Sequence, residues 1–334
     1  MKILHICAGW QKWNGAANIA RMIMDEQRHE GHEVSFTTWA KVRELRAADE
    51  VWIHCGWLPC LWWAALWGRN VHWMPEACYD PVRLRFHGWK KWLVGPIERW
   101  CLRRCDRIVA TCEAEKGWIV AYLGKRCPEI EVTDIRRFFN LNPVNPVNPV
   151  KKDLHLLYLG RRHPLKGLSY LETALATYYN KWSNAPSSLA PTTACADNPS
   201  SNPSRKAATY YNKCPIEFRV VSDAFGDELE RVWDWCDVLV LPTLSDNFGL
   251  VVAEALERGK RVITTDGAPA WGENLSRVEH ADHVEGGEML SGYGGRLIYL
   301  KGYRDGTPED RVRLLKSAIE NLLSRASLTP PAAK

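Results

Sequence analysis

Short apolar runs alternate with amphipathic segments along the first half of the chain. The amphipathic segments predict helices, the first of which has Asn14 as a candidate N-cap and Gly31 at its end. Apolar strands separated by helices are typical of a parallel α/β sheet. The predicted strands are Lys2–Cys7, Glu33–Thr37, Val51–Cys55, Val71–Met74 and Arg107–Thr111, and the predicted helices are Ala16–Glu30, Glu98–Cys105 and Glu113–Leu123.

The same alternation restarts in the second half of the chain and predicts a second α/β unit. Its last helix begins with Pro, Glu and Asp, which helix starts favour. The predicted strands are Leu154–Leu159, Glu217–Val221, Val238–Leu241 and Arg261–Thr265, and the predicted helices are Leu168–Thr177, Gly226–Trp235, Leu250–Arg258 and Pro308–Ser324.

A proline-rich segment separates the two patterns. It reads NPVNPVNPV, which cannot continue a helix and is poor central strand. We therefore predict an N-terminal domain over residues 1–141, a stiff linker over 142–152 and a C-terminal domain over 153–305, followed by a helix and tail over 306–334. Two domains are also the natural expectation for a chain of 334 residues.

Residues 178–214 differ from the rest of the second half. They are rich in Ser, Asn, Pro, Ala and Thr, and the string ATYYNK occurs at Ala176–Lys181 and again at Ala208–Lys213. A segment with so little to bury cannot offset the entropy lost on ordering. We expect a disordered, partly duplicated surface insert within the C-terminal domain.

Composition narrows the class of protein. The hydrophobic share of 46% and the charged share of 25% are those of a soluble globular protein. A net charge of +5 is too small for a dedicated nucleic-acid binder, but it suits anionic ligands or an anionic membrane surface. The start MKILHICAGW lacks the features of a signal peptide, and no apolar run is long enough to span a bilayer. We expect a cytoplasmic protein.

Cysteine usage agrees with that compartment. The chain has 11 cysteines, an odd number, so free thiols in a reducing environment are the expectation. Cys101 and Cys105 fall on one predicted helix, whereas structural zinc sites usually need two close pairs in loops. We therefore expect no metal site.

The stretch Leu241–Trp271 is the most informative in the sequence. It reads as an apolar strand, a loop, a glycine turn, a helix and a second strand. Asp246 in the loop and Glu254 in the helix could grip two separated hydroxyl-bearing parts of one ligand. The helix N-terminus between them offers unpaired backbone N–H groups, which suit a phosphate. A sugar joined to a ribose through a pyrophosphate fits this arrangement.

A second motif, LGRRHPLKG, lies at Leu159–Gly167. Gly160 turns the chain after a strand, and Arg161 and Lys166 place two cations near the C-terminal edge of the sheet. Arg supplies a bidentate fork and Lys a point charge, so the pair could neutralise a diphosphate. His163 lies between them, but a loop histidine is more often a local hydrogen-bonder, and we leave it outside the site.

The first predicted helix opens with the string WNGAAN, which contains Asn14, Gly15 and Ala16. Gly15 would let the backbone approach a ligand, and the helix N-terminus favours an anion. A dinucleotide site would need Gly-x-Gly-x-x-Gly here. Only Gly9 and Gly15 are present, with bulky residues between them, so an NAD-dependent oxidoreductase is poorly supported.

These motifs resemble those of family-4 glycosyltransferases with the GT-B fold. Asp246-x7-Glu254, with NFGL after the first acid, is similar to the Glu-x7-Glu donor-binding motif, and LGRRHPLKG is similar to the phosphate-binding segment. The resemblance covers nearly the whole chain except the insert and the tail. It implies an α/β protein of GT-B architecture, in which two Rossmann-like domains with parallel sheets face a cleft and the last helix crosses back to the first domain.

The resemblance also implies a role for each site residue. The N-terminal domain would bind the acceptor and the C-terminal domain the donor. Arg161, Lys166 and the backbone at Phe248–Leu250 would hold the donor diphosphate, while Asp246 would hold sugar hydroxyls and Glu254 the ribose. The predicted donor site consists of Gly160, Arg161, Lys166, Asp246, Asn247, Phe248, Gly249, Leu250 and Glu254, and the predicted acceptor and phosphate loop of Asn14, Gly15 and Ala16.

The chain departs from the family pattern at two of these positions. Asp246 is one methylene shorter than the usual Glu, so the identity of the donor does not transfer from relatives. Asn14 stands where the relatives commonly have Gly, so no contact at Asn14 is transferred either. The family generally works without a bound metal, and the chain has no Asp-x-Asp metal motif, so we expect no metal and no cofactor.

The string MPEACYDPVRL and the basic stretch after it resemble a subset of these enzymes that build lipopolysaccharide and other bacterial surface polysaccharides. Many relatives carry Arg-Gly or a His in this loop, where the chain has Glu76 and Ala77. Glu76 is therefore a candidate for acceptor contact or proton transfer, and the alternative is a structural loop acid.

Residues 83–107 combine many Arg and Lys with apolar positions spaced three or four residues apart. One interpretation is a basic amphipathic helix that rests on an anionic membrane surface. The other is a helix that packs its apolar face on the core and leaves a basic side in solvent, and we favour it slightly. The apolar positions are Trp89, Trp92, Leu93, Ile97 and Trp100.

The predicted function is retaining transfer of a sugar from a nucleotide-sugar, UDP-linked, to a hydroxyl of a growing glycan in lipopolysaccharide core or another surface polysaccharide. The partners would be that donor, a glycan or glycolipid acceptor and an anionic membrane face, without nucleic acid. Positioning and charge stabilisation would dominate catalysis. Two alternatives stay open, a nucleotide-sugar epimerase or hydrolase of the same fold and a non-catalytic glycan-binding scaffold.

Overall fold

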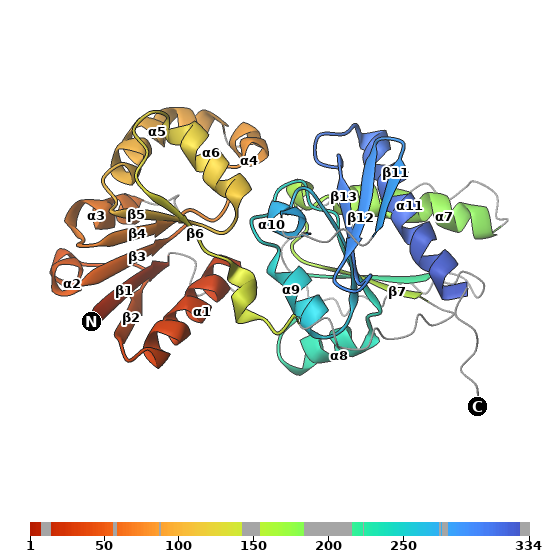
Figure 1. Cartoon of the computed structure of the whole chain (residues 1–334), viewed down its shortest axis with the longest axis horizontal. Helices are drawn as coiled ribbons and strands as arrows, with labels where there is room; N and C mark the ends of the chain where they lie inside the picture. The colour runs from red at the N-terminus through yellow and green to blue at the C-terminus, as the bar shows by residue number, and fades with distance from the viewer. Residues whose placement is uncertain are drawn as a thin grey trace, which may run out of the picture.

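The chain forms two α/β domains, each built on its own sheet (Figure 1). The computed structural model describes residues 1–7, 15–55, 59–86, 88–141, 154–183, 216–222, 224–273, 275 and 280–327. The predicted linker therefore lies outside the described residues, as do most of the predicted insert and the end of the tail.

The N-terminal sheet has six strands, all parallel, in the order β2-β1-β3-β4-β5-β6. Five of the six were predicted within a residue at each end. The short edge strand β6 was not, because three residues are too few to give a pattern. The strands are β1 (Lys2–Cys7), β2 (Glu33–Thr37), β3 (Glu50–His54), β4 (Val71–Met74), β5 (Arg107–Ala110) and β6 (Ile130–Val132).

Helices cover both faces of this sheet. α1 packs on one face through Ile19 and Ile23, and α2, α3, α5 and α6 contribute to the core on the other. This double cover explains why the strands are almost continuously apolar. The helices are α1 (Gly15–His29), α2 (Val42–Ala47), α3 (Pro59–Trp67), α4 (Pro81–Phe86), α5 (Gly88–Leu102) and α6 (Glu113–Leu123), and a 3₁₀ turn, η1, spans Ile135–Phe138.

The prediction for α5 was wrong in two respects. The helix begins ten residues before the predicted Glu98 and ends at Leu102, so Cys105 lies just beyond it. Its apolar stripe does not face the core. Trp89 is 72% exposed and Trp92 82%, and Leu93, Ile97 and Trp100 are exposed as well, because the opposite face, with Glu98 and Cys101, is the one that packs inward.

The C-terminal sheet has seven strands in the order β11-β12-β13-β10-β9-β7-β8. Strands β7, β8, β9, β10 and β13 run parallel, as predicted for a Rossmann-like domain, but β12 pairs antiparallel with both β11 and β13. A two-residue turn ending in Gly286, whose φ is +97°, creates this edge hairpin. The strands are β7 (Leu154–Leu159), β8 (Ile216–Val221), β9 (Val238–Leu241), β10 (Arg261–Thr265), β11 (His280–Val284), β12 (Gly287–Gly292) and β13 (Leu297–Lys301).

The last helix does not cross back to the first domain, so that expectation was wrong. α11 packs against α7 and against β12 and β13, within the C-terminal domain (Figure 1). Its buried stripe, Leu314, Leu315, Ala318, Ile319 and Leu322, matches the apolar face of α7. The helices are α7 (Leu168–Ser183), α8 (Asp227–Trp235), α9 (Leu250–Glu257), α10 (Pro269–Gly272) and α11 (Pro308–Ser327), and a 3₁₀ turn, η2, spans Pro164–Lys166.

Two smaller features complete the fold. α7 continues to Ser183, so the insert predicted from residue 178 begins as helix, and residues 184–215 lie outside the described part. Among the helices that the structure describes, none combines the length and apolar composition needed to cross a bilayer. Eight cysteines whose side chains are described carry free thiols: Cys7, Cys55, Cys78, Cys101, Cys105, Cys112, Cys127 and Cys236.

The two domains meet through specific polar contacts. The Glu273 carboxylate accepts hydrogen bonds from the backbone N–H groups of Glu113 (2.7 Å) and Ala114 (2.6 Å), at the start of α6. Arg304 of the C-terminal domain forms an ion pair with buried Asp80 of the N-terminal domain. A carboxylate at a helix N-terminus is stabilised by the helix dipole, so these contacts hold the domains in a defined orientation.

Candidate active site

A cleft of about 830 Å³ lies between the two domains. Its walls come from the ends of strands β1, β3 and β4 and the start of α1 on one side, and from the turns after β7 and β9 and helix α9 on the other. Asn14 lies outside the described residues. The cleft contains all the other predicted site residues, Gly15, Ala16, Glu76, Gly160, Arg161, Lys166, Asp246, Asn247, Phe248, Gly249, Leu250 and Glu254.

The turn after β7 depends on a glycine. Gly167 has a φ of +67°, and a Cβ added to it would lie 1.9 Å from the carbonyl oxygen of Pro242. Only glycine fits this close approach, which seats η2 and Lys166 against the end of β9. His163 caps η2 by accepting a hydrogen bond from the backbone N–H of Leu165 at 3.2 Å, so it is the local hydrogen-bonder that the sequence indicated.

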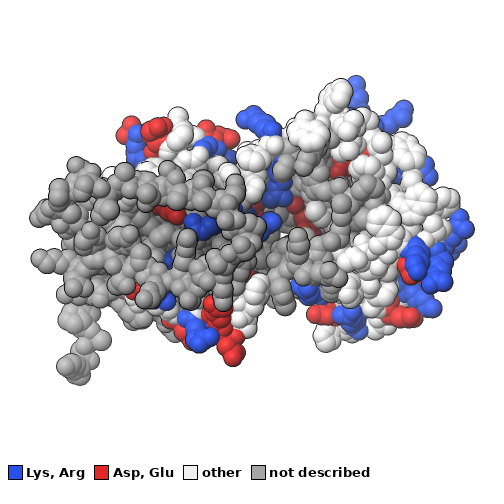
Figure 2. All heavy atoms as spheres, turned by 180° about the vertical axis from the view of Figure 1, so that it is seen from behind, with Lys and Arg blue, Asp and Glu red and all other residues white. Residues whose placement is uncertain are grey.

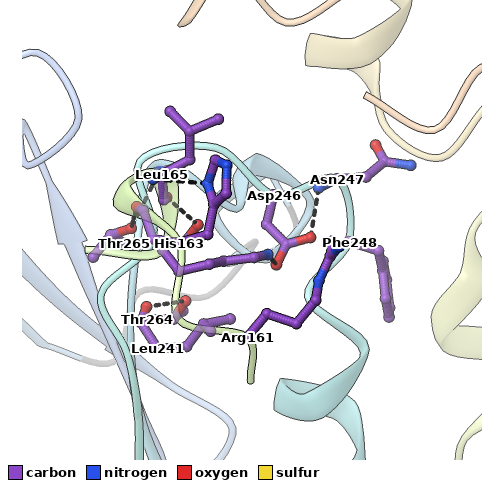
Figure 3. A network of polar contacts seen from close by, with 12 residues as sticks. Arg161, His163, Leu165, Leu241, Asp246, Asn247, Phe248, Thr264 and Thr265 are labelled. Carbon is purple, nitrogen blue, oxygen red and sulfur yellow. Dashed lines mark hydrogen bonds and ion pairs between the residues drawn. The ribbon is translucent and has the colours of Figure 1, made fainter. Parts of the chain in front are cut away.

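Lys166 and Asp246 form an ion pair across the C-terminal wall of the cleft. The second oxygen of Asp246 accepts a hydrogen bond from the backbone N–H of Asn247 at 2.8 Å, and Figure 3 shows this loop together with the turn that carries Arg161 and His163. Burial opposes ionisation of Asp246, but Lys166 outweighs it and the pKa of Asp246 lies below its ordinary value. Asp246 is therefore a carboxylate in the absence of ligand.

The starts of α1 and α9 face each other across the cleft. Gly249, with a φ of +66°, precedes α9, and Gly15 is the first residue of α1. A Cβ added to Gly15 would lie 3.7 Å from Leu250 Cδ1, so the two helix N-termini are close together. The first N–H groups of a helix have no intrahelical partner and carry the positive end of its dipole, so this part of the cleft suits an anion.

Glu254 lies one turn into α9 and lines the same cleft. Burial raises the pKa of its carboxyl group, and the neighbouring carboxylates of Glu257 and Glu230 raise it further, while Arg258 opposes them. Within the described part of the chain, the Glu254 carboxylate has no hydrogen-bond or ion-pair partner. It is available to hydroxyl groups of a ligand.

Asn247 connects the donor side of the cleft to the N-terminal domain. Its side-chain oxygen lies 2.8 Å from the Thr111 hydroxyl, which donates its one proton to the Glu115 carboxylate at 2.9 Å. Among the described residues, hydrogen-bond geometry gives the buried Asn247 side-chain nitrogen no partner, although the Asn247 side chain lies close enough to Glu115 to lower the pKa of that carboxyl group. Buried polar groups are rarely left unsatisfied, so this amide is a candidate donor to a ligand.

Glu76 lies in the loop after β4 and is only 7% exposed. Glu76 and Ala77 have φ values of 56° and 59°, a left-handed conformation that non-glycine residues rarely adopt. The Glu115 carboxylate holds this loop by accepting the Ala77 N–H at 2.6 Å. Burial raises the pKa of Glu76 well above its ordinary value, Glu115 raises it further, and Arg83 lowers it.

Sequence reasoning missed Arg83, a cation that α4 of the N-terminal domain brings into the cleft. Its Nη1 lies 3.5 Å from the backbone oxygen of Glu76, and its charge also lowers the pKa of Asp246. The only signal was its position in a predicted loop after the strand at Val71–Met74. Glu257, the last residue of α9, and Arg258, which follows it, also line the cleft and were not predicted.

The arrangement can bind a doubly charged anion that carries hydroxyl-bearing groups on both sides. Arg161, Lys166 and Arg83 supply cationic side chains, and the helix starts supply N–H groups. Asp246 and Glu254 supply hydroxyl acceptors on either side. Among the described residues, no group of three His, Cys, Asp or Glu side chains is placed to hold a metal ion.

Two known protein families match the sequence, one in each domain. The family described as "Glycosyl transferase 4-like domain" matches residues 35–133, and the family described as "Glycosyl transferases group 1" matches residues 153–285. Together the two matches span well over half of the chain. No curated protein sequence matches the chain significantly.

Several solved structures share the fold along nearly the whole chain. Sucrose-phosphate synthase from Thermosynechococcus elongatus has a TM-score of 0.56 at 13% identity and covers 98% of this chain and 94% of its own. Alr3699/HepE from Anabaena, solved with UDP and glucose, has a TM-score of 0.57 at 14% identity, with 98% and 92% covered. WaaG, a glycosyltransferase of lipopolysaccharide biosynthesis, has a TM-score of 0.52 at 10% identity, with 98% and 92% covered.

At these identities the structural similarity establishes the fold, while the family matches establish the class of enzyme. With a glycosyltransferase family matched in each domain and the two-domain fold shared from end to end, this chain is an enzyme of the family 4-like glycosyltransferases with the GT-B fold.

Proposed function

We propose that the protein is a retaining glycosyltransferase that moves a sugar from a UDP-sugar to a hydroxyl of a growing surface glycan. The observation that carries the proposal is the composition of the C-terminal wall of the cleft. Two cations, Arg161 and Lys166, line the same wall as two hydroxyl acceptors, Asp246 before the start of α9 and Glu254 one turn into that helix. Along the chain, Asp246, the anion-binding start of α9 and Glu254 follow one another, as sugar, diphosphate and ribose do in a nucleotide-sugar.

The diphosphate would bind Arg161, Lys166 and the first N–H groups of α9. Lys166 is paired with Asp246 when no ligand is bound, so donor binding would exchange one anionic partner of Lys166 for another. Asp246 would then be released to accept hydrogen bonds from sugar hydroxyls. The same cations would stabilise the charge that develops on the diphosphate as the bond to the sugar breaks.

Glu254 would accept hydrogen bonds from the ribose hydroxyls. Glu254 lies one turn into α9, after the helix start that would hold the diphosphate, and it lines the same cleft as Asp246. Uridine is our choice of base because a structure of similar fold, Alr3699/HepE, was solved with UDP-glucose. The sugar is not fixed by this comparison, because Asp246 is shorter than the Glu usual at this position.

A binding screen tests the proposal. We expect calorimetry to show that the wild-type protein binds one UDP-sugar and that Glu254→Ala weakens this binding at least about tenfold, the effect of roughly 1.4 kcal/mol lost with one hydrogen-bonded charged group. Glu320→Ala is the matched control, because Glu320 is an exposed acid on α11 outside the cleft. A folded wild-type protein that binds no nucleotide-sugar would contradict the proposal and favour a non-catalytic scaffold.

Turnover then distinguishes the enzyme classes. Transfer should require an acceptor glycan and should retain the configuration of the anomeric carbon. Lys166→Ala should sharply reduce the rate while leaving the fold intact. Release of UDP at full rate without any acceptor would instead favour a hydrolase of the same fold.

We further propose that helix α5 rests on an anionic membrane face, where a glycolipid acceptor would be found, and that the protein works in the cytoplasm. The exposed apolar stripe of α5 supports this, together with Arg99 and Arg104 on the same helix and the turn after it. In the view from behind, Lys and Arg side chains project from the top of this domain beside largely uncharged surface (Figure 2).

Each basic residue near an anionic surface contributes about 1 kcal/mol of attraction, and buried aromatic side chains add apolar anchoring. We expect the protein to float with liposomes that contain anionic lipid and to remain in solution with neutral liposomes. Trp92→Glu should abolish flotation, whereas Trp39→Glu, at an exposed tryptophan elsewhere in the domain, should not. Absence of flotation with either lipid would remove the membrane proposal.

A further inference from the structure

A line of buried polar side chains runs from α1 through the sheet to Glu76. Gln27 Oε1 lies 2.7 Å from His5 Nε2, and His5 Nδ1 lies 3.0 Å from His54 Nε2. His54 Nδ1 lies 3.5 Å from Glu76 Oε1. All four residues are buried, and the line ends at the cleft, where Glu76 forms part of the wall.

The fold does not need polar side chains at these positions. His5 on β1 and His54 on β3 point to the face of the sheet that α1 covers, where Trp52, Met74 and His72 are their neighbours. Burying polar groups there costs free energy unless each is hydrogen-bonded, and apolar side chains would pack more favourably. Packing alone therefore does not explain these polar side chains. They can take part in chemistry at Glu76, the member of the line that reaches the cleft.

The direction of the protons along the line is fixed at its first member. The Gln27 side-chain oxygen can only accept, so His5 carries its proton on Nε2. His5 Nδ1 then accepts from His54, which must carry its proton on Nε2. His54 Nδ1 is left with a lone pair that faces Glu76 Oε1, and neither of these two buried atoms has another hydrogen-bond partner.

Two acceptors cannot face each other at 3.5 Å in a buried site unless one carries a proton. Burial lowers the pKa of His54 to about 3, so the ring stays neutral. Burial and the Glu115 carboxylate both raise the pKa of Glu76, against the opposing charge of Arg83. The proton therefore belongs to the Glu76 carboxyl group.

The other charged groups near Glu76 have separate partners. Glu115 accepts hydrogen bonds from Ala77 N–H, Thr111 N–H and the Thr111 hydroxyl, an arrangement that suits a carboxylate. Across the cleft, the charges of Lys166 and Asp246 pair with each other. Arg83 is the cation whose charge lowers the pKa of Glu76, and its Nη1 lies by the Glu76 backbone oxygen.

We propose that Glu76 acts as a neutral carboxylic acid, which donates its proton to His54 and uses its second oxygen to accept a hydrogen bond from a substrate hydroxyl. This rests on the proposed glycosyl transfer and decides between the two roles that the sequence left open for Glu76. A neutral group here avoids placing a negative charge beside the donor diphosphate. It also means that Glu76 is not the base, so the proton of the acceptor hydroxyl leaves on the departing diphosphate as the new glycosidic bond forms.

The first test requires no substrate. In ¹⁵N NMR spectra of the full chain at pH 7, His5 and His54 should both be neutral and carry their protons on Nε2, with each signal assigned by its loss in His5→Gln or His54→Gln. Protons on Nδ1 of both rings would overturn the proposal, because His54 would then donate to a Glu76 carboxylate. This outcome is independent of whether the protein transfers sugars.

The second test uses turnover with the donor that the binding screen identifies. Gln reproduces the shape and the hydrogen bonds of a neutral Glu. Glu76→Gln should therefore retain at least about ten times the kcat/KM of Glu76→Leu, which removes both the donor to His54 and the acceptor for the substrate hydroxyl. The wild-type rate should fall as pH rises through the pKa of Glu76, and Glu76→Gln should lack this fall. Glu320→Gln is the control.

A general base would behave differently. Glu76→Gln would then lose about 10²- to 10⁴-fold, as much as Glu76→Leu, and the proposal would be refuted. If Glu76→Leu fails to fold, the pH profiles of the wild type and Glu76→Gln, with the NMR measurement, still decide. If no donor binds, the proposed function fails while the NMR measurement still reports the proton on Glu76.

Discussion

The buried pair His5 and His54 should make the protein unusually sensitive to mild acid. Both side chains are completely buried, and burial lowers the pKa of each from 6.5 to about 3, with the charge of His54 lowering the pKa of His5 further. The unfolded chain binds protons at these histidines below pH 6.5, whereas the folded protein does not. The stability they contribute is therefore present above pH 6.5 and is lost as pH falls toward 3.

The magnitude follows from the two pKa values. Each histidine should lower the free energy of unfolding by about 2 kcal/mol at pH 5 relative to pH 7.5, and the pair by about 4 kcal/mol. At pH 5 this loss depends almost entirely on the pKa of the histidines in the unfolded chain. Any histidine pKa below about 4 in the folded protein therefore gives the same result. Such a loss is a large fraction of the roughly 5–15 kcal/mol that stabilises a typical protein.

Urea denaturation followed by tryptophan fluorescence measures this effect between pH 5 and 7.5. Buried carboxyl groups with raised pKa values, such as Glu76, act in the opposite direction, because the folded state loses stability as pH rises through their folded pKa. The contribution of the histidines is therefore measured by comparing the pH dependence of unfolding between the wild type and histidine variants. His54→Gln should flatten the pH dependence by about 2 kcal/mol over this range. His283→Gln, at a histidine whose side chain is 84% exposed, should leave it unchanged.

A pH dependence of the free energy of unfolding that is the same in the wild type and in His54→Gln would refute this reasoning. It would mean that His54 titrates in the folded protein as it does in the unfolded chain. The buried line from Gln27 to Glu76 would then not hold neutral rings, and the proton assignment at Glu76 would lose its support.

Two further predictions concern the turn after β7 and the loop at Glu76. Gly167→Ala should destabilise the protein by more than about 2 kcal/mol in urea denaturation, because the added Cβ would meet the Pro242 carbonyl group. Gly31→Ala is the control and should cost only about 1 kcal/mol, because φ is +85° there but nothing lies within 4 Å. Equal costs for the two variants would contradict the steric argument. Glu115→Gln should destabilise the protein by about 1–3 kcal/mol. It should also move the fall in turnover at high pH to a lower pH, because it removes a charge that raises the pKa of Glu76. A pH profile that does not move would show that Glu115 does not influence Glu76.

Much of the fold could be predicted because both sheets consist of buried strands with a simple apolar pattern. Strands such as Lys2–Cys7 and Arg261–Thr265 were predicted with their observed bounds. The errors fell where tertiary packing overrides pattern. The stripe from Trp89 to Trp100 has the spacing of a core-facing helix, but packing of the opposite face of α5 leaves it exposed.

In the candidate site too, residues in local motifs could be predicted, whereas residues placed by tertiary packing could not. Local motifs predicted Lys166, Asp246 and Glu254 because each belongs to a recognisable string that follows a strand, and the structure brings them into one cleft. The roles assigned to them stay predictions. Arg83 and His54 could not be found in this way, because their positions in the site depend on how distant elements pack.

The central claim is that the cleft binds the diphosphate of a nucleotide-sugar through Lys166 and the start of α9. The most direct test is to compare the affinities of UDP, UMP and uridine for the wild type and for Lys166→Ala. We expect the wild type to bind UDP most tightly, and the variant to lose about 10- to 100-fold in UDP affinity, or about 1.4–2.8 kcal/mol, while its uridine affinity stays the same. Equal affinities for UDP and uridine in the wild type, or a UDP affinity that does not change in Lys166→Ala, would contradict the account.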